Sequence, residues 1–490
     1  MYKWLQLKSS ADLDSLAAEV SVEYGPTRVI EKLKNGLSDA VKAILIEKNY
    51  IDKDYRSTYY NYYAKKGQAY RPDCIRLHFF DESVTFDPQA LKLYSKHELE
   101  ERYFGYMVLR PTGIGTIGRS VVSPDVRKAS GGAIITANQR IITAKHKVHL
   151  LGYKLTVEGF PSMDQHIDIS VCAHAACWSI LRHYSERYTL YPEFLTHDIT
   201  LMTQQFDPGG LVPSKGLQMS HAERVFQEAG TFPFHVVRTN PQDAAFYRQL
   251  HAYVESGFPL FAADHSVGHA MAIVGYEWEA STPNPIASMR YAWDEVKSII
   301  VVDDNYLPYQ VIEKQGTVPY SAGSIDAFIV ALPEKIFYPA DAVDRLAPTL
   351  FKLAPMLGGL PAQNEVTLRY FITTGSALRR FVRTRESEFD PKLIETIMTL
   401  PFAQFIWIVE IATGEDWAKG QISARAVLDA TASLREFMPF WLFHNRKTAL
   451  LFDRSKVGAG IQGIRELSLS GMENTALTRW DQNLRPTRKK

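Results

Sequence analysis

The sequence predicts an α+β protein of about three domains. The chain has 490 residues, which is too long for one ordinary hydrophobic core. In the middle region, residues 151–338, helical patterns come first and strand patterns follow. That order is typical of an α+β unit in which one helix packs on an antiparallel sheet. We expect this unit to be flanked by an N-terminal α+β accessory domain, residues 1–150, and a C-terminal accessory domain of mixed strands and helices, residues 339–490.

The N-terminal region combines charged helical patterns with aromatic strand patterns. Residues 10–20 and 27–48 are predicted to be helical. Residues 75–80 and 103–109 alternate in polarity and are rich in aromatic side chains, as strands are. Residues 113–118 have the Gly-x-Gly-x-x-Gly spacing of a dinucleotide-binding loop, but the Val- and Ser-rich segment after them cannot open the helix that such a site requires. We therefore expect only a loop there.

The middle region is predicted to begin with helices and to end with strands. A helix is expected to start at Cys172, and a second one covers residues 219–228 and stops before Gly230. Apolar runs at 270–276 and 299–302 predict two buried strands. These elements are the helix and the sheet of the expected α+β unit.

The C-terminal region contains three strand candidates and a basic end. Residues 368–373, 405–411 and 426–429 are rich in β-branched and aromatic side chains. Residues 485–490 form a short basic tail, which we expect to be solvated.

Composition excludes several classes of function. With 55 basic and 54 acidic residues the net charge is +1, so no overall field attracts nucleic acid or an anionic membrane. The N-terminus lacks a signal-type apolar core, and no apolar run approaches the roughly 20 residues of a membrane span. The three cysteines, Cys74, Cys172 and Cys177, are too few for a disulfide framework. We expect a cytoplasmic protein with reduced thiols, and neither a membrane nor a nucleic acid as partner.

Cys172 is the candidate nucleophile. Residues 173–184 are rich in helix formers and residues 168–171 are not, so Cys172 is placed in the first turn of a helix. Unpaired N–H groups and the helix dipole favour an anion at that position, and the thiolate is the reactive form of cysteine. The position therefore favours a lowered thiol pKa.

His269 is the candidate general base for Cys172. It follows Gly268, which we expect to clear space beside the ring, and it precedes a strand that would hold the imidazole in place. His265 is a spare base. The imidazole needs an orienting acid or amide, and Asp303, with Asp304 or Asn305 as alternates, follows the strand at 299–302.

Gln165 is the candidate oxyanion donor. It lies seven residues before Cys172, and its side-chain amide could bind the developing oxyanion together with the backbone N–H of Cys172.

These residues together resemble a papain-like cysteine peptidase. The resemblance covers residues 160–335 and is nearest to the branch of bacteriocin-leader-processing peptidases, although that branch usually has Asp-Cys-Gly where this chain has Val171-Cys172-Ala173. It implies a papain-like domain in which Cys172, His269, Asp303 and Gln165 are catalytic, with a protein or peptide substrate and no cofactor. The pair Cys177-Trp178 is similar to part of the papain motif, which makes Cys177 a rival nucleophile.

Three other interpretations stay open. The chain could be a non-catalytic scaffold that keeps the papain-like fold, with a partner protein on its flanking domains. The same thiol chemistry could also serve an amidase, deamidase or transglutaminase, which share the acyl-enzyme step. A metal site is the third, because soft ligands crowd one segment: Cys172, His174, Cys177 and His183. On a helix, at about 100° per residue, these side chains point in divergent directions, so we expect no metal.

Overall fold

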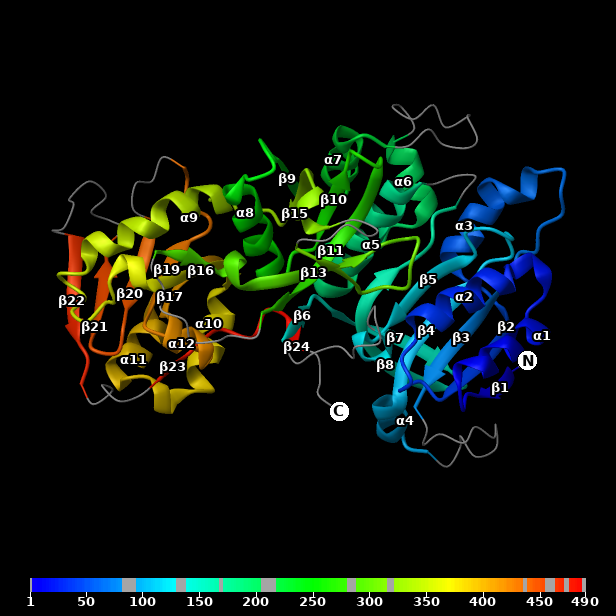
Figure 1. Ribbon diagram of the computed structural model, residues 1–490, viewed down its shortest axis with the longest axis horizontal. Helices are drawn as coiled ribbons and strands as arrows, with labels where there is room; N and C mark the ends of the chain where they lie inside the picture. Colours follow the sequence, from blue (N-terminus) through cyan, green and yellow to red (C-terminus); the bar gives the residue numbers. More distant parts are fainter. Residues whose placement is uncertain are drawn as a thin grey trace.

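The computed structural model is a mixed α+β structure built around three large sheets. It describes residues 2–81, 94–128, 138–166, 171–203, 217–279, 288–314, 321–434, 439–453, 463–470 and 476–486. The three sheets lie in a row along the longest axis, with the N-terminal sheet at one end and the C-terminal sheet at the other (Figure 1). Among the described helices, none is long and apolar enough to cross a membrane.

The first sheet has seven antiparallel strands in the order β1-β2-β3-β4-β5-β8-β7. The strands are β1 (Tyr2–Gln6), β2 (Ala43–Tyr50), β3 (Cys74–Phe80), β4 (Tyr103–Leu109), β5 (Ile117–Val122), β7 (Ala144–Leu150) and β8 (Tyr153–Ser162). The helices of this region are α1 (Ser15–Glu19), α2 (Pro26–Gly36), α3 (Lys53–Asn61) and α4 (Lys96–Arg102). Residues 113–116 form a loop that leads into β5, which begins at Ile117, and no helix starts there.

One expectation for this region is wrong, and the first sheet runs past the expected domain boundary. The helix expected over 27–48 ends at Gly36, and Ala43–Tyr50 form β2 because an apolar run, fully buried over residues 43–46, pairs with β1 on one side and β3 on the other. The first sheet also extends beyond residue 150. β7 and β8 form a hairpin whose turn residues, Leu151 and Gly152, have φ values of 48° and 85°, so the expected boundary at 150 falls on a tight turn.

The second sheet has eight strands and carries the candidate site. Its main path is β14-β13-β11-β10-β15-β9, made of β9 (Phe232–Val237), β10 (Leu260–Asp264), β11 (His269–Trp278), β13 (Val296–Val302), β14 (Gln310–Glu313) and β15 (Ala327–Leu332). The helices are α5 (Cys172–Arg187), α6 (Thr196–Thr203), α7 (Met219–Glu228) and α8 (Ala244–Glu255). Helix α5 contacts β11 and β10 of this antiparallel sheet, and also β7 and β8 of the first sheet.

The third sheet has seven strands in the order β12-β16-β17-β19-β20-β21-β22. The strands are β12 (Arg290–Tyr291), β16 (Val366–Thr374), β17 (Phe405–Thr413), β19 (Ala424–Asp429), β20 (Phe440–His444), β21 (Thr448–Phe452) and β22 (Ile464–Ser468), and β18 (Gln421–Ile422) pairs separately with β23 (Leu477–Thr478). The helices are α9 (Ala340–Leu346), α10 (Gly375–Arg383), α11 (Pro391–Thr399) and α12 (Gly414–Ala418).

Strands cross between the regions. β6 (Gln139–Ile141), from the N-terminal region, pairs with β11 of the second sheet, and the chain end β24 (Arg485–Pro486) pairs with β6. The start of the basic tail is therefore not solvated: Arg485 also forms an ion pair of 3.0 Å with Asp125. Residues 487–490 of that tail lie outside the described residues. The three regions thus form one connected body.

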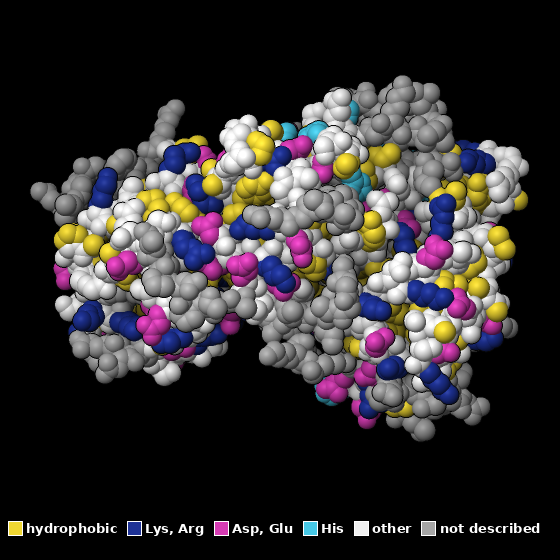
Figure 2. All heavy atoms as spheres, in the orientation of Figure 1, with side chains coloured by type: hydrophobic (Ala, Val, Ile, Leu, Met, Phe, Trp, Pro, Cys, Tyr) yellow, Lys and Arg dark blue, Asp and Glu magenta, His cyan; other side chains and the backbone are white. Residues whose placement is uncertain are grey.

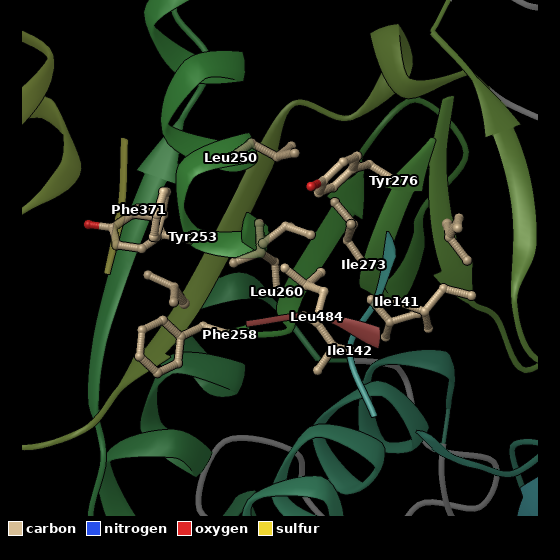
Figure 3. Packing of buried hydrophobic residues seen from close by; sticks show 14 of the residues in the cluster. Ile141, Ile142, Leu250, Tyr253, Phe258, Leu260, Ile273, Tyr276, Phe371 and Leu484 are labelled. Carbon is tan, nitrogen blue, oxygen red and sulfur yellow. The ribbon is translucent and has the colours of Figure 1, made fainter. Parts of the chain in front are cut away.

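Apolar side chains from all three regions share one core. Figure 3 shows Ile141, Phe371 and Leu484 in the cluster that contains Leu260 and Ile273 of the second sheet. On the surface seen in Figure 2, basic and acidic side chains are interspersed, as the net charge of +1 suggests.

Candidate active site

A cleft of about 770 Å³ opens over the start of α5 and the facing ends of β10 and β11. Its lining contains Gln165, Cys172 and His269, and also the spare base His265, all of which the sequence singled out. The rest of the lining is mostly apolar, with Leu217, Met219, Phe261, Ala263 and Ala270, and a smaller polar part contains Gln218, Ser220 and Asp264. A cleft of this size and composition is typical of a small-molecule or peptide site.

Cys172 is the first residue of α5, as the sequence predicts. Val171 before it is extended, with φ −107° and ψ 177°, and the N–H of Val171 donates to Nδ1 of His174 at 3.3 Å. The thiol is half-buried at the cleft, whereas nearly all of the following helix is buried. The first-turn N–H groups and the helix dipole of a 16-residue helix therefore act on a sulfur that a substrate can reach.

His269 begins β11 and faces both Cys172 and two carboxylates. Its Nε2 lies 3.1 Å from Oδ2 of Asp303 and 4.0 Å from Oδ1 of Asp304. The side chains of Cys172 and Asp303 both act on the imidazole and raise its pKa. Because Nε2 is turned to Asp303, Nδ1 is the nitrogen that is left for the thiol.

The charge of the imidazole is set by these partners. Burial alone would lower the pKa of His269, but the hydrogen bonds to Asp303 and Cys172, and the charges of these groups, outweigh burial and raise the pKa to about 10. The imidazole therefore stays protonated at neutral pH beside a sulfur that can carry the compensating negative charge. A thiolate–imidazolium pair is the reactive form of a cysteine nucleophile.

Gly268 matters for its backbone conformation, and not because a larger side chain there would clash. Its φ is +64°, and a Cβ added there would meet no atom within 4 Å. The expectation that Gly268 clears room beside the ring is wrong. The left-handed conformation turns the chain into β11 and directs His269 into the cleft.

The pairing of β11 with β13 brings the acids to the histidine. Ala272 is paired with Val302 in this antiparallel register, so the residues after Val302 lie opposite His269. The carboxylate of Asp303 is fully buried, and its Oδ1 accepts the backbone N–H of Asn305 at 2.8 Å. Asp303 is thus the residue that is held against the imidazole, while Asn305 is exposed and contributes its backbone N–H to Asp303.

Asp304 is a second buried acid at this site. Neither of its carboxylate oxygens has a hydrogen-bond partner among the described residues. Burial and the neighbouring charge of Asp303 raise the pKa of Asp304 to about 6. A carboxyl that is protonated in mild acid and ionised at neutral pH therefore stands behind His269.

Of the other sequence candidates, Cys177 lies away from the cleft, whereas His265 and Gln165 line it. Cys177 is completely buried in the core, and burial raises the pKa of its thiol, so it is neither accessible nor activated. His265 borders the cleft but pairs with Asp326 at 2.5 Å, and its side chain is 61% exposed. Gln165 lines the cleft, while residues 167–170 between Gln165 and Cys172 lie outside the described residues.

The four ligands of the alternative metal site do not form a cluster. His183 is fully buried and stacks on Phe160, with ring centroids 5.0 Å apart, away from the cleft that Cys172 lines. Among the described residues, the group with ligand atoms close enough for a metal is instead His269, Asp303 and Asp304, whose atoms lie within 4.8 Å of one another. These are the residues of the imidazole–carboxylate contact, and an ion there would compete with the pair between His269 and Asp303.

Two charged residues beside the site were not singled out from the sequence. Nζ of Lys32, in α2, donates to Oδ1 of Asp164 at 2.7 Å and to the backbone carbonyl of Asp304 at 2.9 Å. Lys32 is one of two lysines in α2, and Asp164 is 132 residues away from it, so no sequence pattern links them.

Comparison with known proteins does not indicate a family for this chain. No model of a known protein family matches the chain, and no curated protein matches its sequence.

Proposed function

We propose that the chain is a cysteine-nucleophile hydrolase that cleaves protein or peptide amide bonds through a thioester. The observation that carries this proposal is the chain of contacts from Cys172 to His269 to buried Asp303 at a cleft of about 770 Å³. A nucleophile, a base that contacts it and a third group that orients the base are the parts that acyl transfer requires.

In the first half of the reaction, the thiolate of Cys172 attacks the substrate carbonyl carbon, and a C–S bond forms while the carbonyl oxygen becomes an anion. The backbone N–H of Cys172 and the side-chain amide of Gln165 stabilise this oxyanion. His269 then donates its proton to the leaving nitrogen, and the C–N bond breaks to leave a thioester on Cys172.

In the second half, His269 accepts a proton from water, and the resulting hydroxide attacks the thioester. The thiolate of Cys172 leaves, and the acid product is released with His269 protonated again. Asp303 stabilises the imidazolium in both halves and holds the ring with Nε2 toward itself.

The test is labelling with an alkyne-bearing vinyl sulfone, which reacts with activated thiolates. We expect one label per chain on Cys172, complete loss of labelling in Cys172→Ala, and unchanged labelling in the matched variant Cys177→Ala. Labelling that persists in Cys172→Ala and is lost in Cys177→Ala would refute the assignment of the nucleophile.

The reaction class needs a second measurement. Mass spectrometry of new peptide N-termini in a proteome treated with wild type should reveal cleavage sites that are absent with Cys172→Ala. Identical N-terminal profiles, together with glutamine residues converted to glutamate or cross-linked only by wild type, would replace the peptidase with a deamidase or a transglutaminase.

A further inference from the structure

Helix α2 of the N-terminal region packs against the loop that carries the two acids. The C-terminal end of the helix touches Leu307, because a Cβ added at Gly36 would lie 2.7 Å from Cδ1 of Leu307. One turn earlier, Lys32 extends toward the site, and its Nζ bonds to the backbone carbonyl of Asp304 at 2.9 Å. An element from outside the expected catalytic domain thus holds the segment that presents Asp303 to His269.

The same ammonium group holds the opposite side of the site. Nζ of Lys32 pairs with Oδ1 of Asp164 at 2.7 Å, and Asp164 is the residue before Gln165. Both side chains are shielded from water, with exposed fractions of 22% for Lys32 and 12% for Asp164. Among the described residues, Lys32 is the cation that forms an ion pair with this carboxylate.

Asp164 is also fixed through its backbone by the first sheet and its loop. Its N–H donates to the carbonyl of Ile117 at 2.8 Å, and its carbonyl accepts from Nη2 of Arg110 at 2.9 Å. The position of Asp164 is therefore determined by residues of the N-terminal region.

The glycine-rich loop supports Gln165 directly. Gly115 has a φ of +61°, and a Cβ there would lie 2.2 Å from the backbone oxygen of Gln165. Arg110 donates to the carbonyl of Gly115, which holds the loop in place. The absence of a side chain at Gly115 thus permits close backbone contact with the proposed oxyanion segment.

We propose that Lys32 is a positioning residue that links the oxyanion segment, Asp164-Gln165, to the acid segment, Asp303-Asp304, and that the N-terminal region is for this reason a structural part of the catalytic unit. This inference rests on the proposed function. One ammonium group bonded to both segments fixes the distance between the oxyanion donor and the residues that orient His269. A misplacement of about 1 Å between such groups can cost about 100-fold in rate.

The experiment compares two reactions of Cys172 in the full-length chain. Acylation by p-nitrophenyl acetate passes through an oxyanion, whereas alkylation by iodoacetamide is a displacement at carbon and forms none. Lys32→Met should lower the ratio of the acylation rate to the alkylation rate by about 10- to 100-fold, because it breaks the link that sets the distance between Gln165 and the acid segment. Lys32→Arg, which keeps the charge and the donors, should recover most of this loss.

The matched control is Lys34→Met on the same helix. Lys34 pairs with Asp14 at 2.7 Å, and its substitution should leave both rates unchanged. If Lys32→Met does not fold by circular dichroism, Asp164→Asn takes its place, since it removes the charge that Lys32 contacts while the backbone bonds to Ile117 and Arg110 stay. The same fall in the rate ratio is expected.

The outcomes separate this inference from the proposed function. A wild type that reacts with both reagents, with an unchanged rate ratio in folded Lys32→Met or Asp164→Asn, overturns the role of Lys32 and leaves the nucleophile assignment standing. A wild type that reacts with neither reagent overturns both. An equal fall of both rates, with a lowered melting temperature, would make Lys32 a purely structural residue and also overturns the inference.

Discussion

Replacing Asp303 with Asn should lower the pKa of His269 and shift the alkaline limit of thiol reactivity. The substitution keeps the shape and one acceptor oxygen of the side chain but removes its charge. In the folded chain that charge lies 3.1 Å from Nε2 of His269 and is fully buried. The imidazolium therefore loses its principal neighbouring anion apart from Cys172.

The size of the shift follows from the geometry. At 3.1 Å and an effective dielectric constant of about 20, two unit charges attract each other by about 5 kcal/mol. The rise of the His269 pKa from 6.5 to about 10 corresponds to a similar energy, at about 1.4 kcal/mol for each tenfold change in proton affinity. Burial opposes this rise and Cys172 shares in it, so Asp303→Asn should lower the pKa of His269 by about 2.

The assay is the pH dependence of alkylation of Cys172 by iodoacetate, followed by mass spectrometry. Iodoacetate is an anion, so it reacts fastest while the imidazolium is present, and the rate falls as pH rises through the pKa of His269. We expect this fall near pH 10 in wild type and near pH 8 in Asp303→Asn.

Asp326→Asn is the matched control, because Asp326 pairs with His265 at the rim of the same cleft. Its alkaline limit should match that of wild type. A limit that stays near pH 10 in Asp303→Asn, or that moves equally in both variants, would refute the electrostatic role of Asp303.

The remaining residues of the site give three further expectations. Gln165→Ala should slow acylation by p-nitrophenyl acetate about 100-fold, since one oxyanion donor is lost. Gln218→Ala, elsewhere in the cleft lining, should leave the acylation rate unchanged. Equal losses of rate in both variants would mean that Gln165 only shapes the cleft and does not bind the oxyanion. Cys177→Ala should keep the reactivity of Cys172. Its unfolding free energy in urea should be lower by about 1 kcal/mol, because removal of the buried sulfur leaves a small cavity. Loss of Cys172 reactivity in a folded Cys177→Ala variant would contradict this expectation. Asp304→Asn should flatten the pH dependence of stability. The pKa of the Asp304 carboxyl is about 6 in the folded chain and about 3.9 in the unfolded chain, so the folded chain keeps this proton to higher pH. The unfolding free energy of wild type should therefore fall by about 3 kcal/mol between about pH 4 and pH 7. Equal shifts of the urea midpoint with pH in wild type and Asp304→Asn would exclude this titration.

The local elements could be predicted because their signals are short-range. The helix start at Cys172 follows from the change of helix propensity over a few residues, and the strand at 103–109 follows from its own aromatic and β-branched side chains. The sequence also predicts that the histidine precedes one strand and that the acids follow another, but the pairing of these two strands is seen only in the structure. The helix expected over 27–48 is wrong because residues 43–50 become a strand through their pairing with β1 and β3, which are distant in the sequence.

The support of the site could not be predicted, because it depends on tertiary contacts. Lys32 meets Asp164 across 132 residues, and Gly115 meets the backbone of Gln165 only after the two regions have packed together. Asp303 lies 3.1 Å from Nε2 of His269 and Asp304 lies 4.0 Å from it, and this difference is not visible in two adjacent aspartates. The sequence therefore predicts which groups could react and leaves open which groups hold them in place.

The most direct test is the reaction of the native chain with a limiting amount of iodoacetamide at neutral pH, followed by peptide mapping. The contact between Cys172 and His269 predicts that Cys172 takes up nearly all of the label, ahead of the buried Cys74 and Cys177, and that His269→Ala slows the reaction by at least about tenfold in a folded chain. Label on Cys74 or Cys177 before Cys172, or an unchanged rate in His269→Ala, would contradict an activated thiol at Cys172.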